Sequence, residues 1–208
     1  MSRAEIERRV EAYYSGRLRE HGPTPRGADW NSVESQRLRF DQLLRLCEGA
    51  GEAFSLLDFG CGYGALLTYL AERGITCDYT GSDLSEEMVG AARAAFGEGP
   101  THRFLAAAAA LPEADYVLAS GIFNVKLDTP VGDWRSYLLE TLARMASLAR
   151  RGFAFNALST YSDPERRRPD LHYADPLELF HHCKTRLSPR VTLLHDYPLW
   201  EFTILVRG

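Results

Sequence analysis

The chain has 208 residues, of which 45% are hydrophobic, and this is enough for one domain with a substantial core. Its formal net charge of −4 gives no indication of a broad basic surface for nucleic acid. No stretch has the apolar character of a signal peptide or a membrane span, and the four cysteines lack the paired spacing of disulfides or metal ligands. We therefore expect a cytoplasmic protein with no membrane segment and no metal site.

Two helices are expected before the first strand. The first covers residues 4–19, where apolar side chains recur at helical spacing. The second covers residues 32–48, with Asn31 as its N-cap and Glu34 at the reciprocal position of a capping box.

The stretch 54–70 is the most informative part of the sequence. An apolar run at 54–57 predicts a buried parallel strand, which Asp58 closes. A tight turn follows, with glycines at positions 60, 62 and 64, and then an apolar helix over 65–73. A strand, a glycine turn and a helix in this order are typical of the ligand-binding opening of a doubly wound sheet.

A second strand is predicted over 76–83, and it ends in an acid. Asp83 lies 25 residues after Asp58, a spacing at which a carboxylate can accept both hydroxyls of a ribose. Leu84 follows, where its side chain can lie against a base. Ser85 is placed to cap the next helix, and Met88 belongs to that helix's apolar face.

The later segments also alternate between strands and helices, and the chain ends in a strand hairpin. Strands are predicted at 102–107, 115–121, 152–158, 190–196 and 200–207, and helices at 134–150 (capped by Asp133) and 176–183 (capped by Asp175). The fold class is therefore α/β: a Rossmann-like, doubly wound, seven-stranded sheet with helices on both faces. The sheet is mostly parallel, with an antiparallel C-terminal strand hairpin.

Two motifs in this frame resemble those of a known family. The pattern Asp58-x-Gly60-x-Gly62-x-Gly64 resembles the first motif of class I S-adenosylmethionine-dependent methyltransferases, and the segment 81–88 resembles the second. The resemblance implies S-adenosylmethionine as cofactor and methyl transfer as the reaction. It also implies an N-terminal helical cap over residues 1–50 and a catalytic domain over 51–208.

The resemblance also implies which residues contact the cofactor. These are Arg39, Asp58, Gly60, Cys61, Gly62, Asp83, Leu84, Met88, Ala107, Ser120, Gly121 and Ile122. Family members often carry an acid for the adenine amino group where this chain has Ala107. The N-terminal helices of the family commonly shape the acceptor pocket, which makes Tyr13, Tyr14 and Trp30 candidates there.

The loop after the fourth strand is where acceptor chemistry is expected. Asn124 and Lys126 on this loop are candidates for positioning the substrate, and His195, His172 and Tyr161 are candidates for a general base. Of these, Asn124, Lys126 and His195 are the predicted catalytic residues, although a lone histidine such as His195 more often has a structural role. The loop lacks the Asn/Asp-Pro-Pro-aromatic motif of amino-methylating nucleic-acid enzymes, which favours an oxygen or nitrogen atom of a small-molecule or sugar-type acceptor.

Two other functions compete with methyl transfer. One is a non-catalytic S-adenosylmethionine-binding subunit or sensor, which would keep the same acids. The other is a nicotinamide-dependent oxidoreductase, disfavoured because Asp58 would repel a diphosphate and because of the terminal hairpin. The cluster Arg166–Arg168 fits a solvated loop better than an anion site. The sequence leaves open the identity of the acceptor and the oligomeric state.

Overall fold

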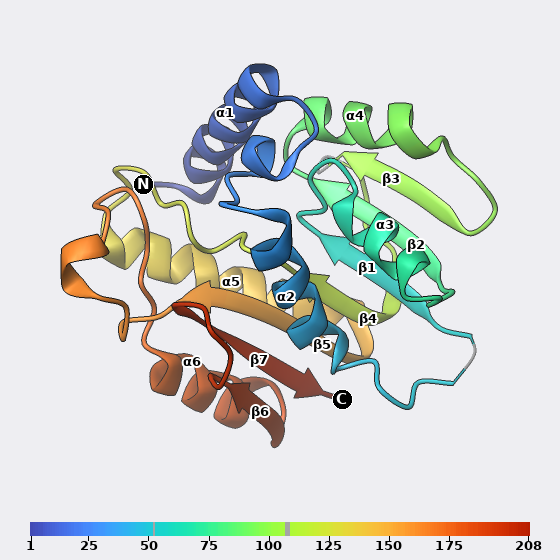
Figure 1. Ribbon diagram of the computed structural model, residues 1–208. Coiled ribbons are helices and arrows are strands. Elements are labelled where there is room, and N and C mark those ends of the chain that lie inside the picture. The colour runs from blue at the N-terminus through green and yellow to red at the C-terminus, as the bar shows by residue number, and fades with distance from the viewer. Residues whose placement is uncertain (52, 107–108) are drawn as a thin grey trace.

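The computed structural model describes residues 1–51, 53–106 and 109–208. Within them, a seven-stranded sheet has the order β3-β2-β1-β4-β5-β7-β6 (Figure 1). The strands are β1 (Ser55–Phe59), β2 (Asp78–Asp83), β3 (His102–Ala106), β4 (Ala114–Ala119), β5 (Ala149–Leu158), β6 (Arg190–Leu194) and β7 (Glu201–Arg207). Neighbours are parallel from β3 to β5, and β7 is antiparallel to both β5 and β6. The predicted fold class is confirmed.

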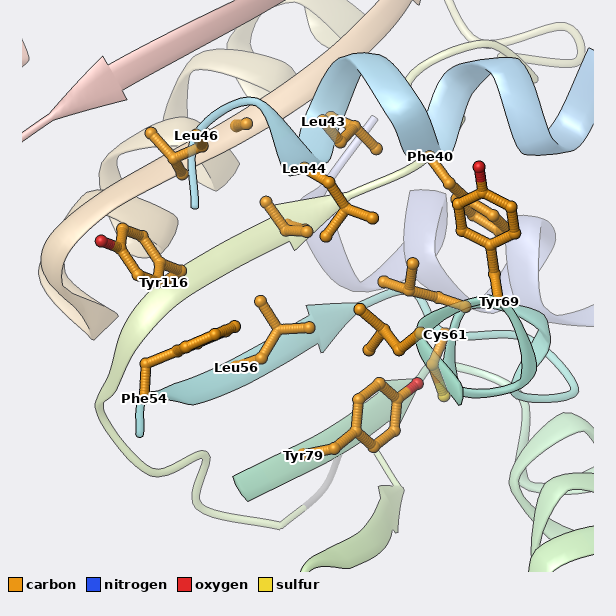
Figure 2. Packing of buried hydrophobic residues seen from close by; sticks show 14 of the residues in the cluster. Phe40, Leu43, Leu44, Leu46, Phe54, Leu56, Cys61, Tyr69, Tyr79 and Tyr116 are labelled. Atoms are coloured by element: carbon orange, nitrogen blue, oxygen red, sulfur yellow. The ribbon is translucent and has the colours of Figure 1, made fainter. Parts of the chain in front are cut away.

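Helices cover both faces of this sheet (Figure 1). They are α1 (Arg3–His21), α2 (Val33–Leu44), α3 (Ala65–Glu72), α4 (Glu86–Phe96), α5 (Val131–Leu148) and α6 (Pro176–His182). Successive residues of a strand point to opposite faces, so Leu56 and Leu57 of β1 enter two different core clusters. The first cluster contains side chains of α2, α3 and α4, and Figure 2 shows part of it. The second contains side chains of α5 and α6.

Helix α1 packs against the ends of helices from both layers. It contacts α4 on one side and α5 on the other. Its Ile6 and Val10 are buried with Trp134 and Tyr137 of α5 in a third, smaller core cluster. The N-terminal helices therefore pack as part of the same body as the sheet, and the division at residue 50 stays a prediction.

Two predicted helix caps are wrong. Ser32, rather than Asn31, caps α2, because its hydroxyl accepts a hydrogen bond from the Ser35 amide at 3.1 Å. Helix α5 begins at Val131 after Pro130, so Asp133 lies inside its first turn and makes no cap. The predicted caps of α4 and α6 are confirmed: the Ser85 hydroxyl accepts from the Met88 amide, and Asp175 accepts from the Leu177 amide.

The end of α5 also differs from the prediction. The helix ends at Leu148, and Ala149 is already the first residue of β5, paired with Ala114 of β4. Sheet pairing that begins at Ala149 therefore outweighs the helical pattern that continues in the sequence to residue 150.

Candidate functional site

A cavity lies at the carboxyl ends of β1, β2 and β4. It encloses about 1070 Å³ of empty space, including the part open to solvent. Helix α1, the segment before α2, and α2 itself contribute walls, together with the turn after β1 and the middle of α5. The carboxyl ends of parallel strands are where open α/β sheets bind ligands.

The glycine turn after β1 forms one wall of the cavity. The amides of Gly60 and Cys61 both donate to the Ser82 carbonyl, at 2.7 and 2.9 Å, which ties the turn to β2. Gly60 has a φ of 86°, and a Cβ atom there would stand 2.3 Å from Cγ2 of Ile122. Only glycine satisfies both conditions, so no side chain projects from position 60 toward Ile122.

Asp83 closes β2 with its carboxylate on the cavity. One oxygen accepts from the Gly62 amide at 2.8 Å, and the other accepts from the Ser85 amide at 2.9 Å. Burial raises the pKa of Asp83, and these backbone hydrogen bonds oppose that rise. The two bonds fix the orientation of the carboxylate, and each oxygen keeps a second acceptor site for a ligand hydroxyl.

Asp58 forms part of the cavity wall at the end of β1. Its side chain is buried and accepts a hydrogen bond from the Tyr79 hydroxyl at 2.7 Å. Burial raises the pKa of Asp58 to about 7, although the Tyr79 hydrogen bond lowers it. A cationic group of a ligand placed beside Asp58 would favour the charged carboxylate.

The remaining walls supply a polar atom and apolar contacts. The Ser120 hydroxyl is enclosed and has no hydrogen-bond partner among the described residues. Leu84, Met88 and Ile122 add apolar surface. An unpartnered hydroxyl, two carboxylates and a glycine turn fit a ligand with a cationic group, vicinal hydroxyls and a flat base. S-adenosylmethionine has these groups.

The structure brings most of the predicted cofactor residues together. Those that line the cavity are Asp58, Gly60, Cys61, Gly62, Asp83, Leu84, Met88, Ser120, Gly121 and Ile122. Ala107 lies outside the described residues. Among the predicted cofactor residues that the structure describes, Arg39 alone does not line the cavity.

Arg39 requires a correction, because it is not a lining residue. Its guanidinium forms two hydrogen bonds with the Glu201 carboxylate, at 2.8 and 2.6 Å, and a third with the Ser35 carbonyl at 2.6 Å. These partners hold the group away from the cavity, so we withdraw Arg39 as a direct cofactor contact.

The two predicted positioning residues do not line the cavity either. Asn124 is buried, and its side-chain oxygen accepts from the Leu158 amide at 3.0 Å, so it joins the loop to the end of β5. The Lys126 amine donates to the neighbouring Leu127 carbonyl at 3.0 Å. The sequence placed both residues on the correct loop but could not show which way they point.

The candidate bases are also absent from the cavity lining. His195 is exposed, with its ring centroid 5.7 Å from that of Tyr161 and 6.1 Å from that of Phe202. Burial, assisted by the charge of Lys126, lowers the pKa of His172 to about 4, so that ring stays neutral. Among the described residues that line the cavity, none is a histidine or a lysine.

Several lining residues were missed in the sequence. Tyr14 and Trp30 do line the cavity, whereas the Tyr13 hydroxyl donates to Asp29 instead. The residues not anticipated include Arg3, Glu7, Val10 and Glu11 of α1, Gln36 and Phe40 of α2, Tyr63 of the glycine turn, and Tyr137 and Arg144 of α5. The α1 residues recur every three or four positions and so share one helix face, a signal that the sequence does contain.

The described residues contain neither a membrane-spanning helix nor a metal-binding cluster. No helix there is long and apolar enough to cross a bilayer. Nor do three or more histidine, cysteine, aspartate or glutamate side chains gather there in a way that could hold a metal ion.

Comparison with known proteins agrees with this geometry. A family described as "Methyltransferase domain" matches residues 56–152. A protein of Mycobacterium tuberculosis (strain ATCC 25618 / H37Rv), named "Putative methyltransferase Rv1506c", is 52% identical over 158 residues, which is 76% of this chain and 95% of the relative.

Solved structures share the fold at low sequence identity. Magnesium protoporphyrin IX methyltransferase from Synechocystis PCC 6803, with bound S-adenosylhomocysteine, has a TM-score of 0.65 and 17% identity, covering 99% of both chains. The N-methyltransferase NodS from Bradyrhizobium japonicum WM9, with the same molecule bound, has a TM-score of 0.65 and 18% identity, covering 96% of this chain and 98% of NodS. With its motifs, its cavity and its close relative in agreement, this chain belongs to the class I S-adenosylmethionine-dependent methyltransferases.

Proposed function

We propose that this enzyme methylates an oxygen or nitrogen atom of a small-molecule or sugar-type acceptor. S-adenosylmethionine, when bound, supplies the methyl group on its sulfonium. The observation that carries the proposal is the extent of the cavity. Beyond the cofactor residues it continues to Trp30, Gln36, Phe40 and Tyr63, under α1 and α2. A site covered by helices in this way suits a small acceptor better than a polymer.

The proposed roles of the cofactor residues follow from their chemistry. The fixed Asp83 carboxylate accepts the two ribose hydroxyls, and Asp58 favours the cationic amino group. The peptide groups of Gly60 and Gly62 lie beside the methionine part of S-adenosylmethionine. Leu84 and Ile122 lie against the adenine.

The acceptor nucleophile is proposed to need no histidine or lysine base. Neither residue type lines the described part of the cavity, and Asn124, Lys126 and His195 lie elsewhere. Alignment and exclusion of water are then the main contributions of the protein. An unprotonated amine, or a hydroxyl that loses its proton to water, fits this environment. NodS is named an N-methyltransferase, which supports nitrogen as one option for this fold.

A second candidate is a cofactor-binding subunit or sensor without turnover. The observation that favours it is the same absence of the three predicted catalytic residues from the cavity lining. Membership of the methyltransferase family removes the support for a nicotinamide-dependent oxidoreductase.

The test is release of S-adenosylhomocysteine from S-adenosylmethionine with panels of small amines, phenols and sugars as acceptors. Methyl transfer predicts product that depends on one acceptor class and is lost in Asp83→Ala. A sensor predicts tight cofactor binding with no acceptor-dependent release. We expect the reaction to take place in the cytoplasm.

A further inference from the structure

A buried ion pair joins the N-terminal helices to the last strand. Arg39 of α2 and Glu201 at the start of β7 are both buried, with side chains 8% and 2% exposed. The guanidinium and the carboxylate meet through two hydrogen bonds, at 2.8 and 2.6 Å. Burying two charges carries a desolvation cost that such a pair only offsets with good geometry and further hydrogen bonds. The further bonds lead toward the cavity.

One branch from this pair reaches the cavity wall through Asn156. The Asn156 side-chain amide donates to Glu201 at 2.5 Å, and its oxygen accepts from the Gly121 amide at 2.8 Å. Asn156 is fully buried. Gly121 lines the cavity and has a left-handed φ of 74°. The bond from Asn156 therefore holds a backbone conformation that only glycine adopts easily.

The other branch reaches the same wall through Trp30. The Arg39 guanidinium carbon lies 4.2 Å from the centroid of the Trp30 ring, within the range of a cation–π contact. The edge of that ring stands against Gly121, where a Cβ atom would be 2.2 Å from Cη2 of Trp30. Trp30 and Gly121 both line the cavity, whereas Arg39, Asn156 and Glu201 do not. The two branches thus start at one ion pair and end at two residues in contact.

We propose that Arg39, Glu201 and Asn156 are positioning residues that hold Trp30 and Gly121 as one wall of the cofactor cavity. The three residues act on cofactor binding through these two and not by contact. The inference rests on the proposed function only in taking this cavity as the cofactor site. It also gives Arg39 a role in cofactor binding other than the direct contact that the sequence suggested.

The test measures the affinity for S-adenosylhomocysteine by calorimetry in separate and combined variants, and asks whether their effects are coupled. The double variant Arg39→Met/Glu201→Gln leaves no buried charge unpaired, and the new glutamine oxygen can still accept from Asn156. We expect it to weaken binding about fivefold or more, and Trp30→Ala to weaken it similarly. Both changes act through one wall of the cavity. The protein that carries all three substitutions should therefore bind S-adenosylhomocysteine with an affinity within about twofold of that of Trp30→Ala alone.

Two outcomes overturn the proposal. One is binding by Arg39→Met/Glu201→Gln within about twofold of the wild type. The other is losses that multiply when Trp30→Ala is added, since independent effects add in free energy. If the double variant does not fold, Arg39→Lys is used with the same expectations, because lysine keeps the charge but lacks the planar group that stacks on Trp30.

A matched control separates positioning from general stability. Ser55→Ala removes a hydroxyl that donates to the Asp115 carboxylate at 3.0 Å and accepts from the Asp115 amide at 2.8 Å, at the amino end of β1 and outside the cavity lining. It should lower the melting temperature but leave the affinity within about twofold. If the wild-type protein itself fails to bind S-adenosylhomocysteine, the proposed function fails. If the wild type binds and only the coupling is missing, the positioning inference alone fails.

Discussion

The Tyr79 hydroxyl donates a 2.7 Å hydrogen bond to Asp58, and both side chains are buried below the glycine turn. Burial raises the pKa of Asp58 to about 7. The charge of this carboxylate therefore changes across the neutral pH range, on the wall of the cavity that we assign to the cofactor.

Cofactor affinity should rise with pH for this reason. With a pKa of about 7, roughly a tenth of the Asp58 carboxyls are ionised at pH 6 and nine-tenths at pH 8. If the charged form binds the amino group, S-adenosylhomocysteine should bind about tenfold more tightly at pH 8 than at pH 6. Calorimetry at the two pH values measures this. Asp58→Asn should show a flat profile, and an equally steep profile in that variant would contradict the assignment.

The same group should make the unliganded protein less stable as pH rises. The pKa of Asp58 is raised on folding, so the folded state binds a proton more tightly than the unfolded chain. Its stabilising contribution is complete below about pH 4 and is lost as pH rises to about 7. The free energy of unfolding of Asp58→Asn, relative to wild type, should therefore increase between pH 5 and pH 8 in urea titrations. A constant difference would mean that Asp58 titrates normally.

A side chain at Gly60 should damage the cavity more than the fold. Gly60→Ala places a Cβ atom 2.3 Å from Ile122, in addition to backbone strain at φ 86°. Gly74→Ala is the control, since φ is 66° there and the space is open. Both variants should lose roughly 1 kcal/mol or more of stability from the left-handed backbone. Only Gly60→Ala should weaken S-adenosylhomocysteine binding at least tenfold, and equal affinities for the two variants would refute the close approach.

Asn124 should prove structural. Asn124→Ala leaves the Leu158 amide without its partner, which should cost about 1–3 kcal/mol of unfolding free energy. Asn124→Asp keeps an acceptor oxygen at the same place and should lose less. Urea denaturation compares the two. A substrate-positioning role would instead predict two stable variants that both lose turnover.

Motifs that are contiguous in the sequence could be predicted accurately. Asp58, Gly60, Gly62 and Asp83 follow or close β1 and β2, so their positions at the sheet edge follow from the topology alone. Ser120, Gly121 and Ile122 follow β4 for the same reason. These residues line the cavity as expected.

The directions of side chains, and partners that are distant in the sequence, could not be predicted in this way. The partner of Arg39 is Glu201, which lies 162 positions later, and no local pattern connects them. Asn124 is on the expected loop, but its side chain turns toward β5 because the Leu158 amide needs an acceptor. The lining residues of helix α1 share one helix face in the sequence, yet only packing against α4 and α5 brings that face over the cavity.

The most direct test of the cofactor assignment is calorimetric binding of S-adenosylhomocysteine to the wild type and to Asp83→Ala. Asp78→Ala, an exposed acid at the other end of β2, is the control. We predict micromolar binding by the wild type and the control, and binding at least tenfold weaker in Asp83→Ala, because the ribose loses a charged acceptor. Equal affinity in all three proteins would contradict the account, since the carboxylate at the center of the proposed site would then not touch the cofactor.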